Sequence, residues 1–417
     1  MMLRSFLTRA ALLAALLCTS APAAMAQSVR IATPTVAYRY DIATLTQGTM
    51  HVVAPNRLAV NGHEITADAI DITIDATPHE AHRVDIALNA SGRPIVTADG
   101  ALAPHLSVTQ ADDRIEIVAS AALQDEVTYH LSGTSVRSVV IRGSYKCAVV
   151  LDGVDITAAG TLPALWIDNG KRIDMVLPDG TINRLADAPD NALRAALLIK
   201  GHAEWKGGGA LSLRGRSRHA YASNEYTWLR EGFGRLTIEE AASDGLHIRQ
   251  YLRMDGGTIV TANTAGDGID VERTLRDDGT PTDDELNGQI LINGGTLDLS
   301  VSATDVKGIK SEGDCTLSGG TLRATVSGNG SKGLSCDGNL LIQQKTATPT
   351  RVEMTVTATT HLPNTTNEAK ARGIKVKGNF TFDGGTIQIS ATGAKSKAIS
   401  VDGTYEYRSG TTNAAVE

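Results

Sequence analysis

The sequence predicts an all-β chain that winds as a right-handed parallel β-helix, and three observations lead to this prediction. A charged residue followed by Gly and then Ile or Leu recurs through residues 244–403. About eleven residues after several of these pairs stands Gly-Gly-Thr, and apolar and polar residues alternate in between. A fixed short period is typical of a solenoid, and crossovers between parallel strands are right-handed in nearly all proteins.

The recurring pairs define the length of one repeat. Their successive spacings are 23, 40, 25, 40 and 25 residues. A unit of about 24 residues therefore recurs, and two units carry polar insertions near residues 273–288 and 345–370. We expect both insertions to be loops, or loops with an added strand, on one flank of the solenoid. The anchoring pairs are Gly245-Leu246, Gly268-Ile269, Gly308-Ile309, Gly333-Leu334, Gly373-Ile374 and Ala398-Ile399.

Each unit is expected to consist of strands, because residues on either side of the anchor alternate with a period of two. Leu246 and Ile248 are apolar, for example, whereas His247 and Arg249 between them are polar. This alternation indicates a strand with one buried face. A further Gly five residues after most anchors is expected to supply the freedom of a corner. An array of β-sandwiches is the alternative architecture.

The N-terminal part of the chain divides into two predicted segments. Arg4, Arg9, an apolar run and Ala24-Met25-Ala26 indicate a secretory signal peptide over residues 1–26. Leu17 before Cys18 fits poorly to lipoprotein processing. Residues 27–125 lack the repeat but contain strand-like stretches, so we expect an N-terminal β cap or a small β domain. Residues 126–417 form the predicted β-helix.

Composition limits the location and the partners of the protein. The formal net charge is −7, which argues against nucleic acid as a partner. No apolar stretch after the signal peptide is long enough to cross a membrane, so we expect an exported monomer in the periplasm, at the cell surface or outside the cell. The three cysteines that remain, Cys147, Cys315 and Cys336, are expected to be buried free thiols.

Four acidic residues are candidate metal ligands. Asp244 and Asp267 directly precede successive anchors, so a β-helix would stack them about 4.8 Å apart. Asp270 and Glu272 project outward from the strand that follows. Stacked carboxylates repel each other unless a cation bridges them, and Ca²⁺ takes six to eight oxygen ligands. The alternative is that these acids are solvated or hydrogen-bonded at corners.

Basic residues occupy the same column in the later units. They would form a ladder of positive charge that suits an anionic polymer, such as a polysaccharide rich in uronic acids. A solvated stripe that alternates with acids is the alternative. The candidate substrate-binding residues are Lys307, Lys310, Lys332, Arg372, Lys375 and Lys397.

Other residues that could carry chemistry are less well placed. Tyr221, Tyr226 and Trp228 gather in one segment, and Tyr251 follows on a strand, but packing explains them better than a sugar platform. His202, His219 and His247 are scattered in the sequence, so we expect structural roles for them. No motif identifies a catalytic residue.

Taken together, these motifs resemble a family of secreted bacterial carbohydrate-binding proteins with a right-handed parallel β-helix similar to that of pectate lyases. The resemblance extends over most of residues 127–405. It is carried by Gly-Gly-Thr and by the stretches Val127–Thr134, Leu151–Ile156, Leu177–Asp187, Ser243–Leu246 and Gly266–Ile269. It implies polysaccharide binding, of acidic polymers, with bound calcium.

The function expected from the sequence is therefore non-catalytic binding of an acidic polysaccharide. A calcium-dependent polysaccharide lyase is the first alternative, but a lysine with its ordinary pKa is a poor base at neutral pH, and nothing in the sequence marks an activated one. A structural or adhesive surface solenoid is the second alternative.

Overall fold

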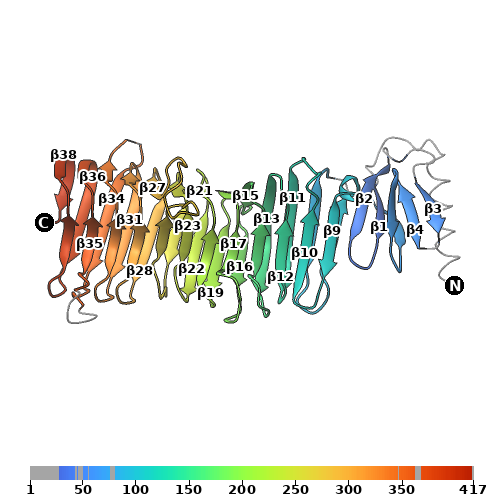
Figure 1. Cartoon of the computed structure of the whole chain (residues 1–417), viewed down its shortest axis with the longest axis horizontal. Helices are drawn as coiled ribbons and strands as arrows, with labels where there is room; N and C mark the ends of the chain where they lie inside the picture. Colours follow the sequence, from blue (N-terminus) through green and yellow to red (C-terminus); the bar gives the residue numbers. More distant parts are fainter. Residues whose placement is uncertain are drawn as a thin grey trace.

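The chain is built from strands that lie across the long axis of an elongated molecule (Figure 1). The computed structural model describes residues 28–42, 45, 50–54, 56–75, 80–345, 347–361 and 368–415. Within these residues there is no α-helix, and the strands form sheets of 23, 12 and 3 members. The all-β prediction and the long parallel sheets are confirmed.

Each repeat consists of three strands, as in β23 (Leu246–Arg249), β24 (Tyr251–Met254) and β25 (Thr258–Thr261). Each of these three strands pairs in parallel with the strand three positions later in the chain. The partners are β26 (Ile269–Glu272), β27 (Gln289–Ile292) and β28 (Thr296–Val301). Leu246 lies opposite Ile269, and Thr258 lies opposite Thr296. The repeat register expected from the anchors and from Gly-Gly-Thr is thus confirmed.

The first strand of each repeat enters the 12-stranded sheet, and the other two enter the 23-stranded sheet. The apolar residues between the sheets form one buried cluster that extends from Val29 to Ile399. Cys147, Cys315 and Cys336 belong to this cluster as free thiols, as predicted. Burial raises the pKa of Cys147 to about 12. The core is therefore continuous along the molecule.

Close approach of neighbouring backbones explains the anchor glycines. A Cβ added to Gly268 would lie 2.6 Å from the carbonyl oxygen of Gly308, and one added to Gly308 would lie 2.6 Å from that of Gly333. Neither distance is compatible with a side chain. β37 (Lys397–Val401) is the edge strand of its sheet, so the anchor position of its repeat has no following strand and is occupied by Ala398.

A ladder of side chains also joins the repeats at one corner. The Asp314 carboxylate accepts a hydrogen bond from Asn339 N–H at 2.7 Å, and the Asn339 side chain accepts one from Asn379 N–H at 2.9 Å. The glycines before them, such as Gly338, do not have positive φ. A Cβ on Gly338 would instead lie 2.7 Å from the backbone of Asp314. These corner glycines therefore permit close stacking, and the predicted need for unusual backbone freedom is wrong.

The N-terminal strands are continuous with the repeats. β7 (Arg83–Leu88) pairs in parallel with β11 (Val127–Ser135), and β10 (Arg114–Ala119) pairs with β12 (Ser138–Arg142). Sheet pairing therefore crosses the boundary predicted at residue 125. Towards the N-terminal end antiparallel pairs appear, as between β1 (Ser28–Ala32) and β2 (Ala37–Asp41).

The two insertions enter the repeats at different corners. Residues 273–288 lie between β26 and β27, as predicted. The segment 345–370 contains β34 (Thr350–Val356), which pairs with β31 (Gly320–Val326) and is the third strand of its own repeat. The extra residues are therefore divided between the two sides of β34. A strand in this segment agrees with the expected alternative of a loop with an added strand, but the absence of Gly-Gly-Thr concealed that β34 belongs to the repeat itself.

Within the described residues, no helix is long and apolar enough to cross a membrane. The predicted signal peptide lies outside the part of the chain that the structure describes.

Candidate functional site

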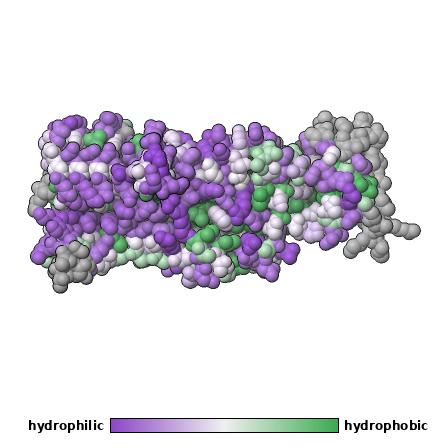
Figure 2. Space-filling view, in the orientation of Figure 1, coloured by the Kyte–Doolittle hydropathy of each residue, from purple (hydrophilic) through white to green (hydrophobic). Residues whose placement is uncertain are grey.

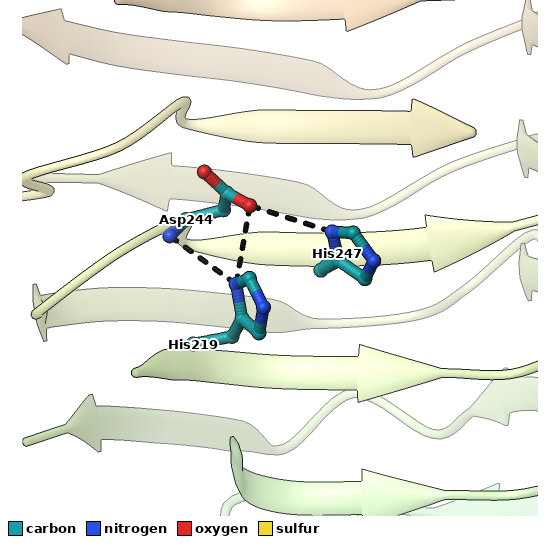
Figure 3. A group of neighbouring side chains, drawn as sticks. All are labelled: His219, Asp244 and His247. Atoms are coloured by element: carbon teal, nitrogen blue, oxygen red, sulfur yellow. Dashed lines mark hydrogen bonds and ion pairs between the residues drawn. The ribbon is translucent and has the colours of Figure 1, made fainter. Parts of the chain in front are cut away.

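Two histidines and three carboxylates gather on the outer side of the 12-stranded sheet. His219 begins β20 (His219–Ser223), Asp244 directly precedes β23, and His247 lies on β23. Asp270 and Glu272 lie on β26. Because β20, β23 and β26 are neighbours in parallel register, side chains from three repeats meet here. Figure 3 shows the Asp244 carboxylate facing both imidazoles.

The distances in this histidine–carboxylate cluster are short. Asp244 Oδ2 lies 3.1 Å from His219 Nδ1 and 3.4 Å from His247 Nδ1. Asp270 Oδ2 lies 3.6 Å from His247 Nδ1, and Glu272 Oε2 lies 3.5 Å from His247 Nε2. His247 is 7% exposed and Asp270 5%, so the cluster is largely removed from solvent although its strands face outward.

The charges in the cluster shift the pKa values in opposite directions. Burial alone would lower the pKa of His247, but the Asp244 and Asp270 carboxylates and the charge of Glu272 outweigh it and raise this pKa to about 9. Burial lowers the pKa of His219, although Asp244 opposes this. Burial would raise the pKa of Asp244, but the two neighbouring histidines outweigh it and lower this pKa. The two histidines therefore differ in protonation at neutral pH.

Of the four predicted metal ligands, three lie in this cluster. Asp267 is directed elsewhere: its Oδ1 accepts Lys307 N–H at 2.8 Å and lies 3.7 Å from Lys307 Nζ. Asp244 Oδ1 likewise accepts Asp267 N–H at 2.8 Å, so each carboxylate also ties one repeat to the next. The repulsion expected between stacked Asp244 and Asp267 is thereby reduced.

Sequence reasoning missed the two histidines as members of a site. Tyr221 pairs with Leu246, which shows that the preceding repeat has the same register. Extending the alignment by one repeat would have placed His219, which lies before the first Gly anchor, in the column of Asp244. His247 follows the anchor Gly245, and the aligned repeats already place it in the column of Asp270. The signal was therefore present for both histidines.

The basic residues of the ladder stack as predicted, but several of their charged groups pair with acids or donate hydrogen bonds to backbone oxygens. Lys332 pairs with Arg372 in register, and Arg372 with Lys397. Lys310 Nζ lies 3.1 Å from Asp270 Oδ1. Lys307 pairs with Asp267 and Lys375 with Asp402, and Lys332 donates a hydrogen bond to the Gly330 carbonyl. Lys397 also takes part in an interaction with another group.

Two members of the ladder are poorly placed for a ligand at the surface. Arg372 is only 4% exposed, and its guanidinium donates to the Ala371 carbonyl at 2.6 Å. Burial lowers the pKa of Lys332, and the like charges of Lys307 and Arg372 lower it further. The ladder is therefore largely an internal ionic network of the sheet.

The aromatic residues fall into two groups. Tyr221 is fully buried, and its hydroxyl lies 2.7 Å from Thr227 Oγ1. Tyr226 and Tyr251 lie at the surface and stack on each other at 4.7 Å. The guanidinium groups of Arg230 and Arg253 both lie over the Trp228 ring.

These contacts occupy ring surface on which a sugar would stack. Tyr226 also stacks on His202 at 4.6 Å, and two guanidinium groups lie over the Trp228 ring. The prediction that packing explains the aromatic residues better than a sugar platform agrees with this arrangement.

A hollow of about 250 Å³ crosses the outer side of the 23-stranded sheet. It spans β13 (Cys147–Thr157), β16 (Ile182–Ala186), β19 (Ala210–Gly215) and β22 (Arg235–Ala241), which pair in this order. We call it the arginine hollow because its lining residues include Arg184, Arg214 and Arg216.

Charge in the arginine hollow is only partly balanced. Arg214 Nε lies 2.7 Å from Glu239 Oε2. Asp155 also lines the hollow and lies opposite Arg184 in the register of β13 and β16. Among the described residues, however, no carboxylate forms an ion pair with the guanidinium of Arg184 or Arg216. Thr157, Ala186 and Ser212 also line the hollow, so small side chains leave room between the charged groups. The sequence analysis did not single out these arginines, because they lie before the regular anchors.

The chain is a repeat protein, because its parallel strands stack on one another around a continuous core. Its charged side chains lie on the outer faces of the sheets. Figure 2 shows a mostly hydrophilic surface over the C-terminal half, with apolar residues gathered nearer the middle. A family model described as carbohydrate-binding domain-containing protein matches residues 111–416. The chain belongs to this family.

One solved structure that resembles the chain is a polysaccharide lyase-like protein from C. thermocellum, determined as a gadolinium derivative. The sequences are 19% identical, the TM-score is 0.44, and the match covers 65% of this chain and 94% of that chain. No curated protein matches the sequence.

Proposed function

We propose that the protein binds a polysaccharide that contains uronic acid, and that the arginine hollow is its binding site. The unpaired guanidinium groups of Arg184 and Arg216 carry this proposal. A planar guanidinium matches a carboxylate through two parallel hydrogen bonds, and uronic acids carry one carboxylate on each sugar. Membership of the carbohydrate-binding family supplies the general class of ligand.

The position of the hollow also favours a polymer over a single sugar. Arg184 lies on β16 and Arg214 on the neighbouring strand β19, and neighbouring strands of a sheet are about 4.8 Å apart. An extended chain can therefore follow the sheet across several strands. Parallel pairing of every third strand, together with the right-handed preference of such crossovers, supports a right-handed parallel β-helix as the scaffold.

Affinity electrophoresis of the purified protein in gels that contain polygalacturonate tests the proposal. Retardation is expected for the wild type, and a loss of affinity of about tenfold or more for Arg184→Ala combined with Arg216→Ala, since a charge-assisted hydrogen bond contributes about 1.5–3 kcal/mol. Arg351→Ala is the matched control, because Arg351 is an exposed arginine of the same sheet on β34.

Two outcomes would contradict the proposal. Equal retardation by a neutral glucan would show that the carboxylates are not recognised. Unchanged affinity in the double variant would show that the polymer binds elsewhere, and the same experiment with variants of the basic ladder would then test that surface.

The predicted calcium requirement can be examined in the same gels with Ca²⁺ and with EDTA. The donor set of the histidine–carboxylate cluster fits Ca²⁺ poorly, because two of its five members are imidazoles and Ca²⁺ takes oxygen ligands. Loss of retardation in EDTA alone would support calcium at the ligand site. Absorbance from unsaturated products would instead support the alternative of a lyase.

A further inference from the structure

We propose that His219, Asp244 and His247 form a binding site for a divalent transition metal of the zinc class. The proposal is independent of the polysaccharide site, since the two lie on different sheets. It rests on the spacing of three ligand atoms, on a buried imidazole nitrogen without a hydrogen bond, and on the chemistry of the donors.

The spacing of the ligand atoms suits a small tetrahedral ion. His219 Nδ1, Asp244 Oδ2 and His247 Nδ1 are separated by 3.1 and 3.4 Å through the carboxylate, and one ligand atom from each residue lies within 4.8 Å of the others. Zinc binds nitrogen and oxygen ligands at about 2.0–2.2 Å, so ligands in a tetrahedron are roughly 3.3 Å apart. Two of the three separations are close to this value.

An unsatisfied group faces this position. His247 Nδ1 is buried and makes no hydrogen bond, although the side chain is only 9% exposed and two carboxylates lie within 3.6 Å. Buried polar atoms usually have a partner, because leaving one without a hydrogen bond forfeits the interactions that it would make with water. A metal ion between His247 and Asp244 would supply that partner.

The donors select the class of metal. Two imidazoles and one carboxylate suit Zn²⁺ and its neighbours in the first transition row, whereas Ca²⁺ and Mg²⁺ bind through oxygen. Three protein ligands leave one position of a tetrahedral ion open. The Asp244 side chain is 14% exposed, so solvent can reach the site from its side.

The surroundings hold the ligands and balance their charge. Asp267 N–H fixes the second oxygen of Asp244 at 2.8 Å, and Glu272 lies 3.5 Å from the far nitrogen of His247. Carboxylates that hydrogen-bond the second nitrogen of a ligating histidine orient the ring and increase its basicity. Lys310 balances Asp270 at 3.1 Å.

Binding also requires a local rearrangement. The two imidazoles are stacked, with ring centres 4.4 Å apart. On binding the ion, His219 Nδ1 would give up its 3.3 Å contact with Asp244 N–H. His247 would also release a proton, because its raised pKa keeps the ring protonated at neutral pH and a ligating nitrogen must be unprotonated. The metal must therefore replace one weak hydrogen bond and one proton.

Titration of the chelator-treated protein with Zn²⁺ and Ca²⁺ by calorimetry tests the proposal, with Co²⁺ as a spectroscopic probe. We expect one equivalent of Zn²⁺, visible absorption bands of tetrahedral Co²⁺, and no displacement of Zn²⁺ by equimolar Ca²⁺. Asp244→Asn should weaken Zn²⁺ binding at least tenfold, and His247→Ala should abolish the Co²⁺ bands. His202→Ala is the matched control, because His202 lies on β18 (His202–Lys206) in the other sheet.

Absence of Zn²⁺ binding by the folded wild type would overturn the proposal, and so would equal binding by all variants. If His247→Ala does not fold, as judged by circular dichroism, Asp244→Asn decides the question, because an amide oxygen preserves the hydrogen bond from Asp267 N–H but is a weaker ligand. The calorimetric titration is carried out without polysaccharide, so a failure of the metal proposal would not bear on the proposed polysaccharide site at the arginine hollow.

Discussion

At the scale of single residues, the outer faces of the sheets are organised by ion pairs between successive repeats. Lys310 with Asp270, Lys377 with Asp337 and Arg214 with Glu239 each join two neighbouring strands. Solvent-exposed pairs such as Arg214 with Glu239 contribute little to stability, about 0–1 kcal/mol each, whereas the Asp270 carboxylate is buried. Their effect on function is larger, because a paired cation is less available to an anionic ligand.

Lys332 is the exception within the basic ladder, and it gives a prediction about stability. Its pKa is lowered by burial and by the like charges of Lys307 and Arg372. The charged form is therefore disfavoured in the folded state at neutral pH. Lys332→Met is expected to raise the free energy of unfolding at pH 7, by less than about 1 kcal/mol because the side chain retains some solvent contact.

The pH dependence follows from the direction of that shift. The folded pKa is lower than the unfolded pKa, so the cost of the charged lysine is complete below the folded pKa. It declines as the pH rises towards the unfolded value. The advantage of Lys332→Met in urea unfolding should therefore shrink between pH 7 and pH 10. Lys310→Met, which breaks the pair with Asp270, should destabilise the protein; a stabilising effect would contradict this account.

At the scale of the elements, the spacing between parallel strands decides which residues the anchors can hold. Each anchor Gly faces the carbonyl oxygen of the next anchor, and the edge strand β37 has Ala398 instead. Glycine therefore recurs in the sequence at the positions where neighbouring strands come too close for a side chain. Positive φ at the second Gly of Gly-Gly-Thr, such as 84° at Gly295, adds a separate requirement at the start of the third strand.

Gly308→Ala tests this steric explanation. A Cβ at position 308 would lie 2.6 Å from the Gly333 carbonyl and 3.1 Å from the Val301 side chain, so a loss of about 1–3 kcal/mol is expected from overpacking. Ala398→Gly removes a methyl group at the edge strand and should cost less. Thermal unfolding of both variants measures the difference, and equal losses would argue against close approach as the cause.

At the scale of the whole molecule, the sheets are long and open, so their ends need protection. An exposed strand edge can pair with another chain. At the N-terminal end, β7 covers the edge of β11 and contributes Val84 and Ile86 to the common core. The proposed role of this segment as a cap follows from that position.

Deletion of residues 28–110 is therefore expected to cause association. It removes β7 and leaves β11 without its neighbour, which exposes both backbone groups and apolar side chains at the end of the core. Light scattering coupled to gel filtration should show dimers or larger species, whereas the full chain is expected to be monomeric. A truncated chain that remains monomeric and folded would mean that the segment is not a cap.

Much of the fold could be predicted because the repeat makes one local pattern visible many times. Alternation at Leu246 and Ile248, the Gly anchors and Gly-Gly-Thr all report contacts with the adjacent repeat, so the register follows from aligning the units. An added strand was expected as one alternative for the second insertion, but the place of β34 in the repeat was not, since its Thr350-Arg351-Val352 start has no glycine signature. Here the strand is specified by pairing with its neighbours.

The sequence by itself determined the all-β class, the repeat length, the strand register, the buried thiols and the gathering of Asp244, Asp270 and Glu272. The tertiary structure alone decided which charges remain available. Arg372 is buried and Lys310 is paired, whereas Arg184 and Arg216 line a hollow in which, among the described residues, neither guanidinium forms an ion pair. The physical reason is that a repeat pattern fixes the column of each residue, but not the direction of a long side chain or the partner that it meets.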